Sequence, residues 1–369
     1  MSIVLVTGAE GFIGRNLTIR LGELGHEVIP IGRGHDASDL ADAAKRADFV
    51  FHLAGVNRPQ DPADFATGNR DFTSEVCEAL AAAGNTAPIA YTSSIQAAAD
   101  NPYGESKRGA EQALERHGEA TGAPVLIYRL PNVFGKWARP NYNSAVATFC
   151  HNIAHGLEIT VNDPAAPLRL VYVDDVVAAF VALLEDGATR DSGFHEVQPV
   201  YETTVGEVAE TIRSFPGSRD TLVSPRVGTG LTRALYSTYL SYLEPEQFSY
   251  GLPIHADPRG AFVEMLKTPD AGQFSYFTSG PGVTRGDHYH HTKAEKFLVI
   301  QGTAHFGFRH IVTGETYEVV TKGGEAKIVE TIPGWTHNIT NIGEDELICM
   351  LWANEIFDRD RPDTIAEKV

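Results

Sequence analysis

The sequence has few cysteines, no long apolar run and no basic stretch at its start. Three cysteines occur in 369 residues, Cys77, Cys150 and Cys349, and they form no CxxC pair, which suits a reducing compartment rather than a disulfide framework. No run of about 18 apolar residues exists, so no segment is expected to span a membrane. The first residues enter an apolar strand directly, so a signal peptide is not expected. These absences indicate a cytoplasmic enzyme.

Basic residues are outnumbered by acidic ones. Thirty Lys and Arg stand against 48 Asp and Glu, which gives a formal net charge of −18. That charge argues against nucleic acid or an anionic membrane surface as a general partner. An anionic small molecule would have to bind through local basic groups and backbone N–H donors. The length exceeds that of one typical hydrophobic core, so two domains are expected.

Strand-like and helix-like segments alternate through the first two thirds of the chain. This alternation predicts an α/β Rossmann-like fold, a doubly wound parallel sheet with helices on both faces. Residues 217–230 are rich in Gly, Ser and Pro and are expected to form a loop. The expected strands are residues 2–6, 26–31, 49–53, 88–93, 125–130 and 168–172, and the expected helices are residues 12–22, 71–83, 103–118 and 231–243.

The pattern changes after residue 248. Short alternating runs at residues 295–300, 303–308 and 316–320 are separated by Gly turns. They predict an all-β domain, most simply a small barrel or jelly roll. We place the boundary near Pro245, so the expected domains are residues 1–245 and 246–369.

Three glycines, Gly8, Gly11 and Gly14, lie between the first expected strand and the first expected helix, with Phe12 and Ile13 among them. Glycine lets the backbone turn tightly and approach a pyrophosphate. The helix N-terminus then presents free N–H groups to the negative charge. This arrangement predicts a dinucleotide-binding site.

Arg33 follows the second expected strand, where an NAD-binding unit usually offers an acidic residue to the ribose 2′-hydroxyl. A guanidinium at this place suits the 2′-phosphate of NADP instead, so NADPH is the expected cofactor. The alternative is a solvated Arg33, with Asp36 taking the ribose.

Tyr103 and Lys107 are spaced i, i+4, which places a phenol and an ammonium on one face of a helix. The charge of Lys107 is expected to lower the pKa of Tyr103 from about 10, so that the phenol exchanges a proton with a substrate oxygen near neutrality. Ser94 can hold that oxygen by a hydrogen bond. The alternative is an exposed helix pair without a catalytic role.

These features resemble the extended short-chain dehydrogenase/reductase family, whose members typically act on nucleotide sugars. The resemblance implies that Leu53 and Ala54 bind the cofactor together with Tyr103 and Lys107, and that Asn132 faces a sugar nucleotide. The matching segments are residues 7–14, 52–55, 129–135 and 172–176, with Ser94, Tyr103 and Lys107.

The sequence departs from this family at two spacings. Only about 15 residues separate Arg33 from the next strand, so a strand of the usual sheet is expected to be missing or replaced. Ser94 precedes Tyr103 by nine residues, closer than is usual, and both departures should open the cleft. Ile95 and Gln96 follow Ser94 where a nucleotide-sugar dehydratase has acidic residues. A reductase is therefore favoured over a dehydratase.

His288 and His290 lie two residues apart on an expected strand, so both side chains point to one face. Glu295 follows across a turn, and His337 could supply a fourth ligand from a later Pro-Gly-x-x-His segment. Imidazoles with one carboxylate suit Zn²⁺ or a similar divalent ion. The neighbouring His291 would point to the opposite face. This spacing resembles the two cupin motifs, and so implies a cupin jelly-roll barrel.

A second resemblance covers the same region. Residues 257–264 and 282–288 resemble the deoxyhexulose-nucleotide 3,5-epimerases, in which the histidine at the position of His288 acts as a base. Arg259, Arg285 and Lys296 would then bind phosphate, or else be only solvated charge. A metal-bound His288 cannot also be a free base. The ion is therefore either a Lewis acid on a sugar carbonyl or a structural ion with a nearby group as base.

The two ends of the chain fit one chemical sequence. A 4-keto sugar has an acidified C–H at C3, and reduction of the ketone removes that acidity, so epimerisation must precede reduction. From end to end the chain resembles the bifunctional epimerase/reductases of capsular polysaccharide synthesis, with diagnostic segments at residues 95–103, 134–144, 235–243 and 290–299.

This resemblance implies C3 epimerisation of UDP-2-acetamido-2,6-dideoxy-β-L-arabino-4-hexulose, followed by NADPH-dependent C4 reduction to UDP-2-acetamido-2,6-dideoxy-β-L-talose, on the way to UDP-N-acetyl-L-fucosamine. It also implies bound zinc and a homodimer. Two alternatives stay open: a reductase whose cupin only binds metal and holds subunits together, and a dehydratase with tightly bound NAD⁺.

Overall fold

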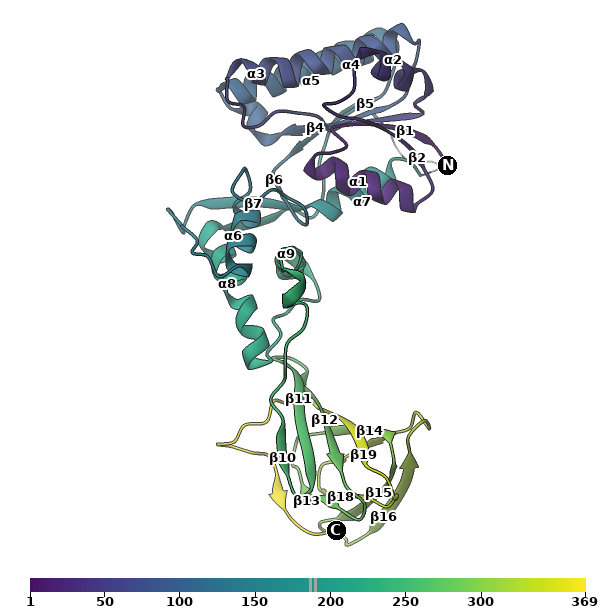
Figure 1. Cartoon of the computed structure of the whole chain (residues 1–369), viewed down its shortest axis with the longest axis vertical. Helices are drawn as coiled ribbons and strands as arrows, with labels where there is room; N and C mark the ends of the chain where they lie inside the picture. Colours follow the sequence, from purple (N-terminus) through teal and green to yellow (C-terminus); the bar gives the residue numbers. More distant parts are fainter. Residues whose placement is uncertain (186–187, 189–190) are drawn as a thin grey trace. The chain divides into compact units, whose positions relative to one another are not determined.

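A six-stranded parallel sheet forms the centre of the first of two units (Figure 1). The computed structural model describes residues 1–185, 188 and 191–369. The first unit comprises Met1–Arg213 and Ala234–Leu243, and the second comprises Ser214–Arg233 and Glu244–Val369. The sheet order is β2-β1-β3-β4-β5-β8. Its strands are β1 (Ile3–Thr7), β2 (Glu27–Ile31), β3 (Phe49–His52), β4 (Ile89–Ser94), β5 (Val125–Leu130) and β8 (Gly193–His195).

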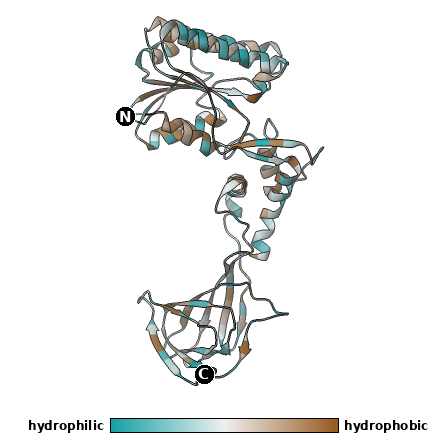
Figure 2. Ribbon diagram, turned by 180° about the vertical axis from the view of Figure 1, so that it is seen from behind, coloured by the Kyte–Doolittle hydropathy of each residue, from teal (hydrophilic) through white to brown (hydrophobic). Residues whose placement is uncertain are grey.

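Helices cover both faces of this sheet, which confirms the expected doubly wound arrangement. Helices α1 (Phe12–Glu23) and α7 (Val173–Ala182) pack on one face, and α2 (Ala37–Arg46), α4 (Phe72–Ala82) and α5 (Pro102–Thr121) pack on the other. The strands alternate accordingly, since Val4 and Val6 face the first layer and Leu5 faces the second. Figure 2 shows apolar residues along the strands of this sheet. Among the described residues no helix is long and apolar enough to cross a membrane.

The connection from β2 to β3 is helix α2, so the expectation of a missing strand is confirmed. Strand β2 lies at the edge of the sheet, and no described strand pairs outside it. The sequence analysis did not foresee α2, although its capping box is readable. The Asp36 carboxylate accepts the N–H groups of Ser38 and Asp39, and the Asp39 side chain accepts the N–H of Asp36.

The first unit continues into a smaller sheet and further helices. The sheet contains β6 (Asn132–Phe134), β7 (Pro167–Tyr172) and β9 (Tyr201–Thr204). The helices are α6 (Ala145–Ala154), together with α8 (Val205–Thr221) and α9 (Gly230–Leu240), which also contain residues of the second unit. The loop expected at residues 217–230 is wrong at its start, because α8 runs on to Thr221. Phe215 and Leu222 are buried there, so packing outweighs the low helix propensity of Pro216 and Gly217. The remaining short elements are α3 (Ala63–Phe65), η1 (Ala66–Asp71), η2 (Ile95–Ala98) and η3 (Pro245–Gln247).

Residues 255–366 of the second unit contribute only β-strands, as expected from their alternating runs. One antiparallel sheet has the order β10-β11-β12-β19-β14-β17 and the other the order β16-β15-β18-β13-β20. Phe277, Phe297 and Phe306 belong to the core that both sheets contribute to. The strands are β10 (His255–Asp257), β11 (Gly260–Thr268), β12 (Gly272–Ser279), β13 (Thr284–Tyr289), β14 (Glu295–Gln301), β15 (Thr303–His310), β16 (Thr316–Lys322), β17 (Ile328–Glu330), β18 (Trp335–Asn341), β19 (Leu347–Ala353) and β20 (Ile365–Ala366).

A buried histidine joins three elements of the first unit. His52 Nδ1 lies 2.7 Å from Thr7 Oγ1 at the end of β1, and its Nε2 lies 2.8 Å from Thr73 Oγ1 on α4. Because the Thr73 hydroxyl donates to the Asn69 carbonyl, it accepts from His52 Nε2–H, and Thr7 therefore donates to Nδ1. Burial lowers the pKa of His52 to about 3, with a smaller contribution from the charge of Lys107. The network requires the neutral imidazole.

Acidification should destabilise the first unit through His52. Its folded pKa of about 3 lies below the ordinary value of 6.5. Between these values the unfolded chain binds more protons, so the stability falls as the pH falls, by about 1.4 kcal/mol per pH unit. In His52→Gln this dependence should disappear. Urea unfolding followed by the helical circular dichroism signal, at about pH 7 and about pH 5.5, measures the difference. Equal pH dependence of the two proteins would contradict the assignment.

Candidate active sites

The turn from β1 into α1 is shaped for close approach of a ligand to the backbone. Gly8 has a φ of +68°, and a Cβ there would lie 2.7 Å from the Ala54 nitrogen. A Cβ at Gly14 would lie 2.1 Å from the Gly8 carbonyl oxygen. Helix α1 begins after Gly11, and no side chain caps it, so the N–H groups of its first turn are open to a ligand.

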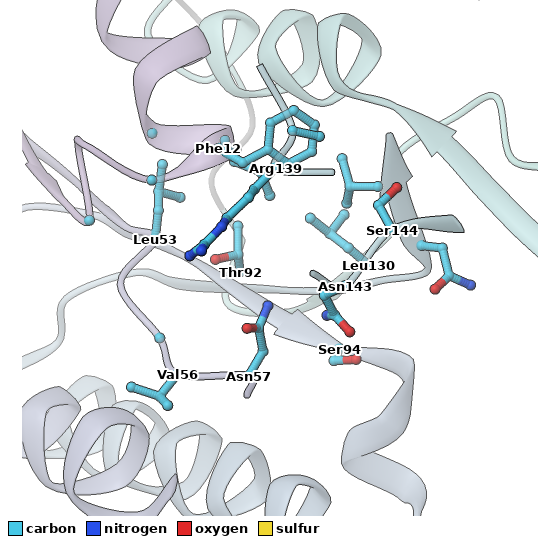
Figure 3. A pocket seen from close by; sticks show the side chains of 18 of the residues that line it. Phe12, Leu53, Val56, Asn57, Thr92, Ser94, Leu130, Arg139, Asn143 and Ser144 are labelled. Carbon is cyan, nitrogen blue, oxygen red and sulfur yellow. The ribbon is translucent and has the colours of Figure 1, made fainter. Parts of the chain in front are cut away.

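A cavity of about 600 Å³ opens beside this turn (Figure 3). It brings together nearly all residues predicted for the cofactor and the reduction site. Ala54 does not line it, but it backs Gly8 and donates its N–H to Thr7 Oγ1. The predicted residues that line the cavity are Gly8, Gly11, Phe12, Ile13, Gly14, Arg33, Leu53, Ser94, Tyr103, Lys107 and Asn132.

The side chains of Arg33 and Asp36 differ in what they can offer a ribose. Arg33 is exposed, lines the cavity and forms no ion pair with the described residues. Asp36 is committed to the N-terminus of α2 and does not line the cavity. The geometry favours Arg33 as the residue that meets the adenosine ribose.

Lys107 is buried beneath the cavity. Its ammonium donates to Tyr91 Oη at 2.9 Å and to the Thr92 carbonyl at 2.8 Å. Burial lowers the pKa of Lys107 to about 8, although Glu111 acts in the opposite direction. Glu111 is itself buried, accepting from Ser93 Oγ and from the Arg129 guanidinium. The Lys107 ammonium is thus bound by two residues of strand β4, Tyr91 and Thr92.

The expected effect of Lys107 on Tyr103 is wrong for this structure. Burial raises the pKa of Tyr103 above its ordinary value, and hydrogen bonding with Ser94 lowers it by less. The reason is the direction of the Lys107 ammonium, which faces Tyr91 and Thr92 rather than the Tyr103 phenol. Tyr103 and Ser94 nevertheless lie together at the cavity, so the pairing of phenol and hydroxyl is present.

The cavity also contains residues that motif reasoning did not assign. Figure 3 shows Arg139 reaching across the pocket toward Leu53. Its guanidinium lies 5.1 Å from the Tyr142 ring and forms no ion pair with the described residues. Trp137 and Arg15 also line the cavity. The segment around Trp137 and Arg139 was noted as diagnostic, but spacing alone gave no signal for where these side chains point.

The predicted metal ligands form one cluster in the second unit. Ligand atoms of His288, His290, Glu295 and His337 all lie within 4.8 Å of one another. His288 on β13 pairs in register with His337 on β18, and Glu295 begins β14. His290 directly follows β13. The ring of His291 packs against Tyr289 instead, as expected for the opposite face.

The donor set fits a divalent metal ion. His337 Nε2 is buried and forms no hydrogen bond with the described residues, although it lies 3.4 Å from Glu295 Oε2. His290 Nε2 lies 3.3 Å from the same oxygen. A buried imidazole nitrogen without a partner, aimed at a carboxylate and other imidazoles, is what a tetrahedral Zn²⁺ site provides. These residues could therefore hold zinc or a similar ion.

The charges in this cluster are balanced by burial and pairing. Burial lowers the pKa of His288 to about 4, and the neighbouring His337 adds to the effect. Burial alone would raise the pKa of Glu295, but the facing imidazoles of His290 and His337 and the charge of Lys293 hold it well below its ordinary value. Lys293 is buried, and its Nζ lies 2.8 Å from Glu295 Oε1. The cluster therefore places a neutral His288 imidazole beside an ionised Glu295 carboxylate.

A second cavity, of about 220 Å³, reaches this cluster. His288, Glu295 and His337 line it together with apolar side chains such as Phe262 and Phe306. One end is therefore polar and the walls are apolar, which suits a small organic ligand.

Two arginines line the same cavity. Arg259 forms a two-pronged ion pair with Asp257 and holds the pKa of that carboxyl at about 2. Burial lowers the pKa of Arg285, with a contribution from Arg259, and Arg285 Nε has no hydrogen-bond partner among the described residues. Lys296 lies elsewhere, exposed on the outer face of β14 and paired with Glu330. The structure brings Arg259 and Arg285 together but not Lys296.

Comparison with known proteins identifies the family. Residues 4–195 match the NAD dependent epimerase/dehydratase family, and residues 255–365 match the polysaccharide biosynthesis C-terminal domain. The chain belongs to the NAD-dependent epimerase/dehydratase family. The first match spans the glycine turn, Tyr103 and Lys107, all of which line the larger cavity, and the family supports a nicotinamide cofactor.

Relatives of this epimerase/dehydratase chain match it over nearly its whole length. A Pseudomonas aeruginosa protein named UDP-2-acetamido-2,6-beta-L-arabino-hexul-4-ose reductase is 57% identical and covers 98% of both chains. The crystal structure of the capsular polysaccharide assembling protein CapF from Staphylococcus aureus matches with 44% identity, a TM-score of 0.92 and full coverage of both chains. A structure of CapF with the inhibitor 3-isopropenyl-tropolone matches at 38% identity and a TM-score of 0.86 over both whole chains. These matches confirm the end-to-end resemblance and the Rossmann-like and all-β fold class.

The close approach at Gly14 predicts a selective loss of dinucleotide binding. In Gly14→Ala the new methyl group would meet the Gly8 carbonyl at 2.1 Å, so the turn must shift. We expect the affinity for a reduced nicotinamide dinucleotide to fall at least about tenfold, because a displaced turn loses its backbone contacts to phosphate. Nicotinamide fluorescence on titration measures it.

Gly22→Ala is the matched control, because nothing lies within 4 Å of a Cβ at that position of the same helix. It should bind the dinucleotide like the parent protein. Equal affinity of Gly14→Ala and Gly22→Ala would contradict a phosphate-binding role for the turn.

Proposed function

We propose that this protein is a bifunctional nucleotide-sugar enzyme that acts on a UDP-linked 4-keto-deoxy amino sugar. The second unit epimerises UDP-2-acetamido-2,6-dideoxy-β-L-arabino-4-hexulose at C3. The first unit then reduces the C4 ketone with NADPH to give UDP-2-acetamido-2,6-dideoxy-β-L-talose for capsular polysaccharide synthesis. The observation that carries the proposal is the presence of two separate polar sites on one chain, one at Tyr103 and one at His288. The name of the Pseudomonas aeruginosa relative supports the substrate.

In the reduction, Tyr103 supplies the proton. NADPH, when bound, supplies the hydride to C4. The Tyr103 phenol, near Ser94, donates its proton to the developing alkoxide, while the Ser94 hydroxyl orients the carbonyl oxygen. Lys107 holds a positive charge beneath the site through its bonds to Tyr91 and Thr92.

In the epimerisation, the apolar cavity of the second unit holds the sugar ring. A base removes the C3 proton, and the resulting enolate is reprotonated on the other face. His288, with its pKa lowered by burial, is neutral and lines the cavity, so it can accept a proton. The alternative is that His288 joins His290, Glu295 and His337 as a metal ligand and a nearby group is the base. Zinc, when bound, would supply a Lewis acid at this end of the cavity.

The diphosphate of the substrate is assigned to Arg259 and Arg285. Arg285 has an unpaired buried Nε and lies close to a second guanidinium, and this repulsion favours an anion between them. A solvated surface pair would have no reason to bury an unsatisfied donor. This observation favours a catalytic second unit over one that only joins subunits. The proposed enzyme is cytoplasmic, as its few widely spaced cysteines suggest, and a homodimer, as the whole-chain resemblance implies.

Deuterium exchange tests the two activities separately. The 4-keto substrate incubated in D₂O without NADPH should gain deuterium at C3, measured by mass spectrometry and NMR. Tyr103→Phe should keep this exchange and lose reduction by about a hundredfold or more, because the proton donor is gone. His288→Ala should lose the exchange and still oxidise NADPH with pre-epimerised substrate. Absence of exchange in the parent protein would sink the role of the second unit.

Cofactor preference tests Arg33. The Arg33 guanidinium is free of ion pairs within the described residues and lines the cofactor cavity. In Arg33→Ser the KM for NADPH should rise about tenfold or more, because a charge-assisted contact to the 2′-phosphate is lost, while the KM for NADH should stay nearly the same. Arg20→Ser is the control, since Arg20 pairs with Glu23 and does not line the cavity. Parallel changes with both cofactors would argue against a 2′-phosphate contact.

A further inference from the structure

The Asp363 side chain binds the turn between β13 and β14, which connects the predicted metal ligands His290 and Glu295. Its carboxylate accepts three successive backbone N–H groups, from His291 at 2.9 Å, Thr292 at 2.7 Å and Lys293 at 2.8 Å. It also accepts the Thr292 hydroxyl at 3.0 Å. One carboxylate thus fixes the backbone between two predicted ligands, His290 and Glu295.

The same residue orients the His290 ring. The Asp363 carbonyl lies 2.5 Å from His290 Nδ1, and a carbonyl can only accept, so Nδ1 carries the proton. His290 Nε2 is then the free lone pair, and it lies 3.3 Å from Glu295 Oε2. A ligating histidine usually has its other nitrogen held in this way, which fixes its tautomer and direction.

Lys293 connects Asp363 to the Glu295 side chain. Its backbone N–H is held by Asp363, and its buried ammonium lies 2.8 Å from Glu295 Oε1. The other oxygen, Oε2, is the one near His290 and His337. With Oε1 occupied by the ammonium, Glu295 offers one oxygen rather than two to an ion. This limits its coordination to a single bond.

The segment around Asp363 is attached to both ligand strands. Strand β20 pairs with β13, where His288 is opposite Ala366. The Glu367 carbonyl accepts the Thr336 hydroxyl on β18 at 2.5 Å, and the Glu367 carboxylate accepts from Arg309 at 2.7 Å. Residues 363–367 therefore cover the strands that present His288 and His337.

We propose that Asp363 is a positioning residue of the metal site, and that residues 363–367 form a strap whose order is linked to metal binding. Asp363 sets the His290 tautomer through its carbonyl and sets the Glu295 side chain through Lys293. By linkage, an ion that binds the ordered cluster stabilises the folded strap, and loss of the strap lowers the affinity of the cluster for the ion. This inference rests on the proposed metal site but not on the proposed reactions.

Zinc affinity of Asp363→Asn tests the positioning role. The amide keeps the size of the side chain but loses the charge that holds three N–H groups. We expect zinc affinity, measured by competition with a chromophoric chelator, to fall about tenfold to a hundredfold. Asp360→Asn is the control, because Asp360 is an exposed carboxylate on the same segment. Zinc affinity of Asp363→Asn within about twofold of the parent would overturn the proposal. A parent protein that binds no zinc would instead sink the metal site itself.

Hydrogen exchange in the parent protein tests the linkage without any variant. Adding zinc to the metal-free protein should slow exchange at the amides of residues 291–293 and 365–367, while β16, which belongs to the same sheet but holds no ligand, should change little. If zinc binds and the exchange of both segments is unchanged, the strap is not part of the site. This measurement decides the matter even where Asp363→Asn fails to fold.

Discussion

Both sites depend on the burial of a charged group among rigid donors and acceptors. In the first unit that group is the Lys107 ammonium, which is buried against Tyr91 and the Thr92 carbonyl. Burying an ammonium is costly, and its pKa of about 8 reflects this. The cost is tolerated because β4 and α5 hold the partners in place, and because Glu111 lies on the same helix. An ammonium held by these two hydrogen bonds keeps its position when a ligand enters the cavity.

In the second unit the buried charged group is a carboxylate, that of Glu295. Glu295 stays ionised because Lys293 and two imidazoles face it, and His288 stays neutral chiefly because it is buried. A site of neutral imidazoles around one carboxylate has high affinity for a cation and leaves a net charge near zero or positive when filled. In the proposed reaction, that charge and the nearby Arg259 and Arg285 would attract an anionic nucleotide sugar to an otherwise acidic protein.

The parts of the sites that could be read from the sequence are those fixed by the geometry of one element. The glycine turn, the i, i+4 pair of Tyr103 and Lys107, and the His288-x-His290 spacing need no knowledge of the rest of the chain. Lys296 was considered as a phosphate ligand or as solvated charge, and in the structure it lies outside the smaller cavity and pairs with Glu330. Its neighbour Glu295 points inward, and a strand turns successive side chains to opposite faces. The same rule of alternation could have excluded it.

Contacts between distant segments were out of reach. Asp363 lies 70 residues beyond Lys293, and nothing in either segment marks the pairing. The direction of the Lys107 ammonium, and with it the pKa of Tyr103, depends on how β4 lies against α5. Helix α2 is different, since its capping box at Asp36 and Asp39 is formed by residues of one short segment and could have been recognised in the sequence.

The sizes of the two cavities bear on how one substrate could be epimerised in one site and reduced in the other. The larger, about 600 Å³, extends from the glycine turn to Tyr103 and Asn132 and has the size of an ordinary small-molecule site. The smaller, about 220 Å³, has room for a sugar ring but not for a whole nucleotide sugar, so the diphosphate would lie at its arginine-lined mouth. Reduction in the larger site then removes the ketone, and with it the acidity at C3, so the epimerised product cannot return through the first step.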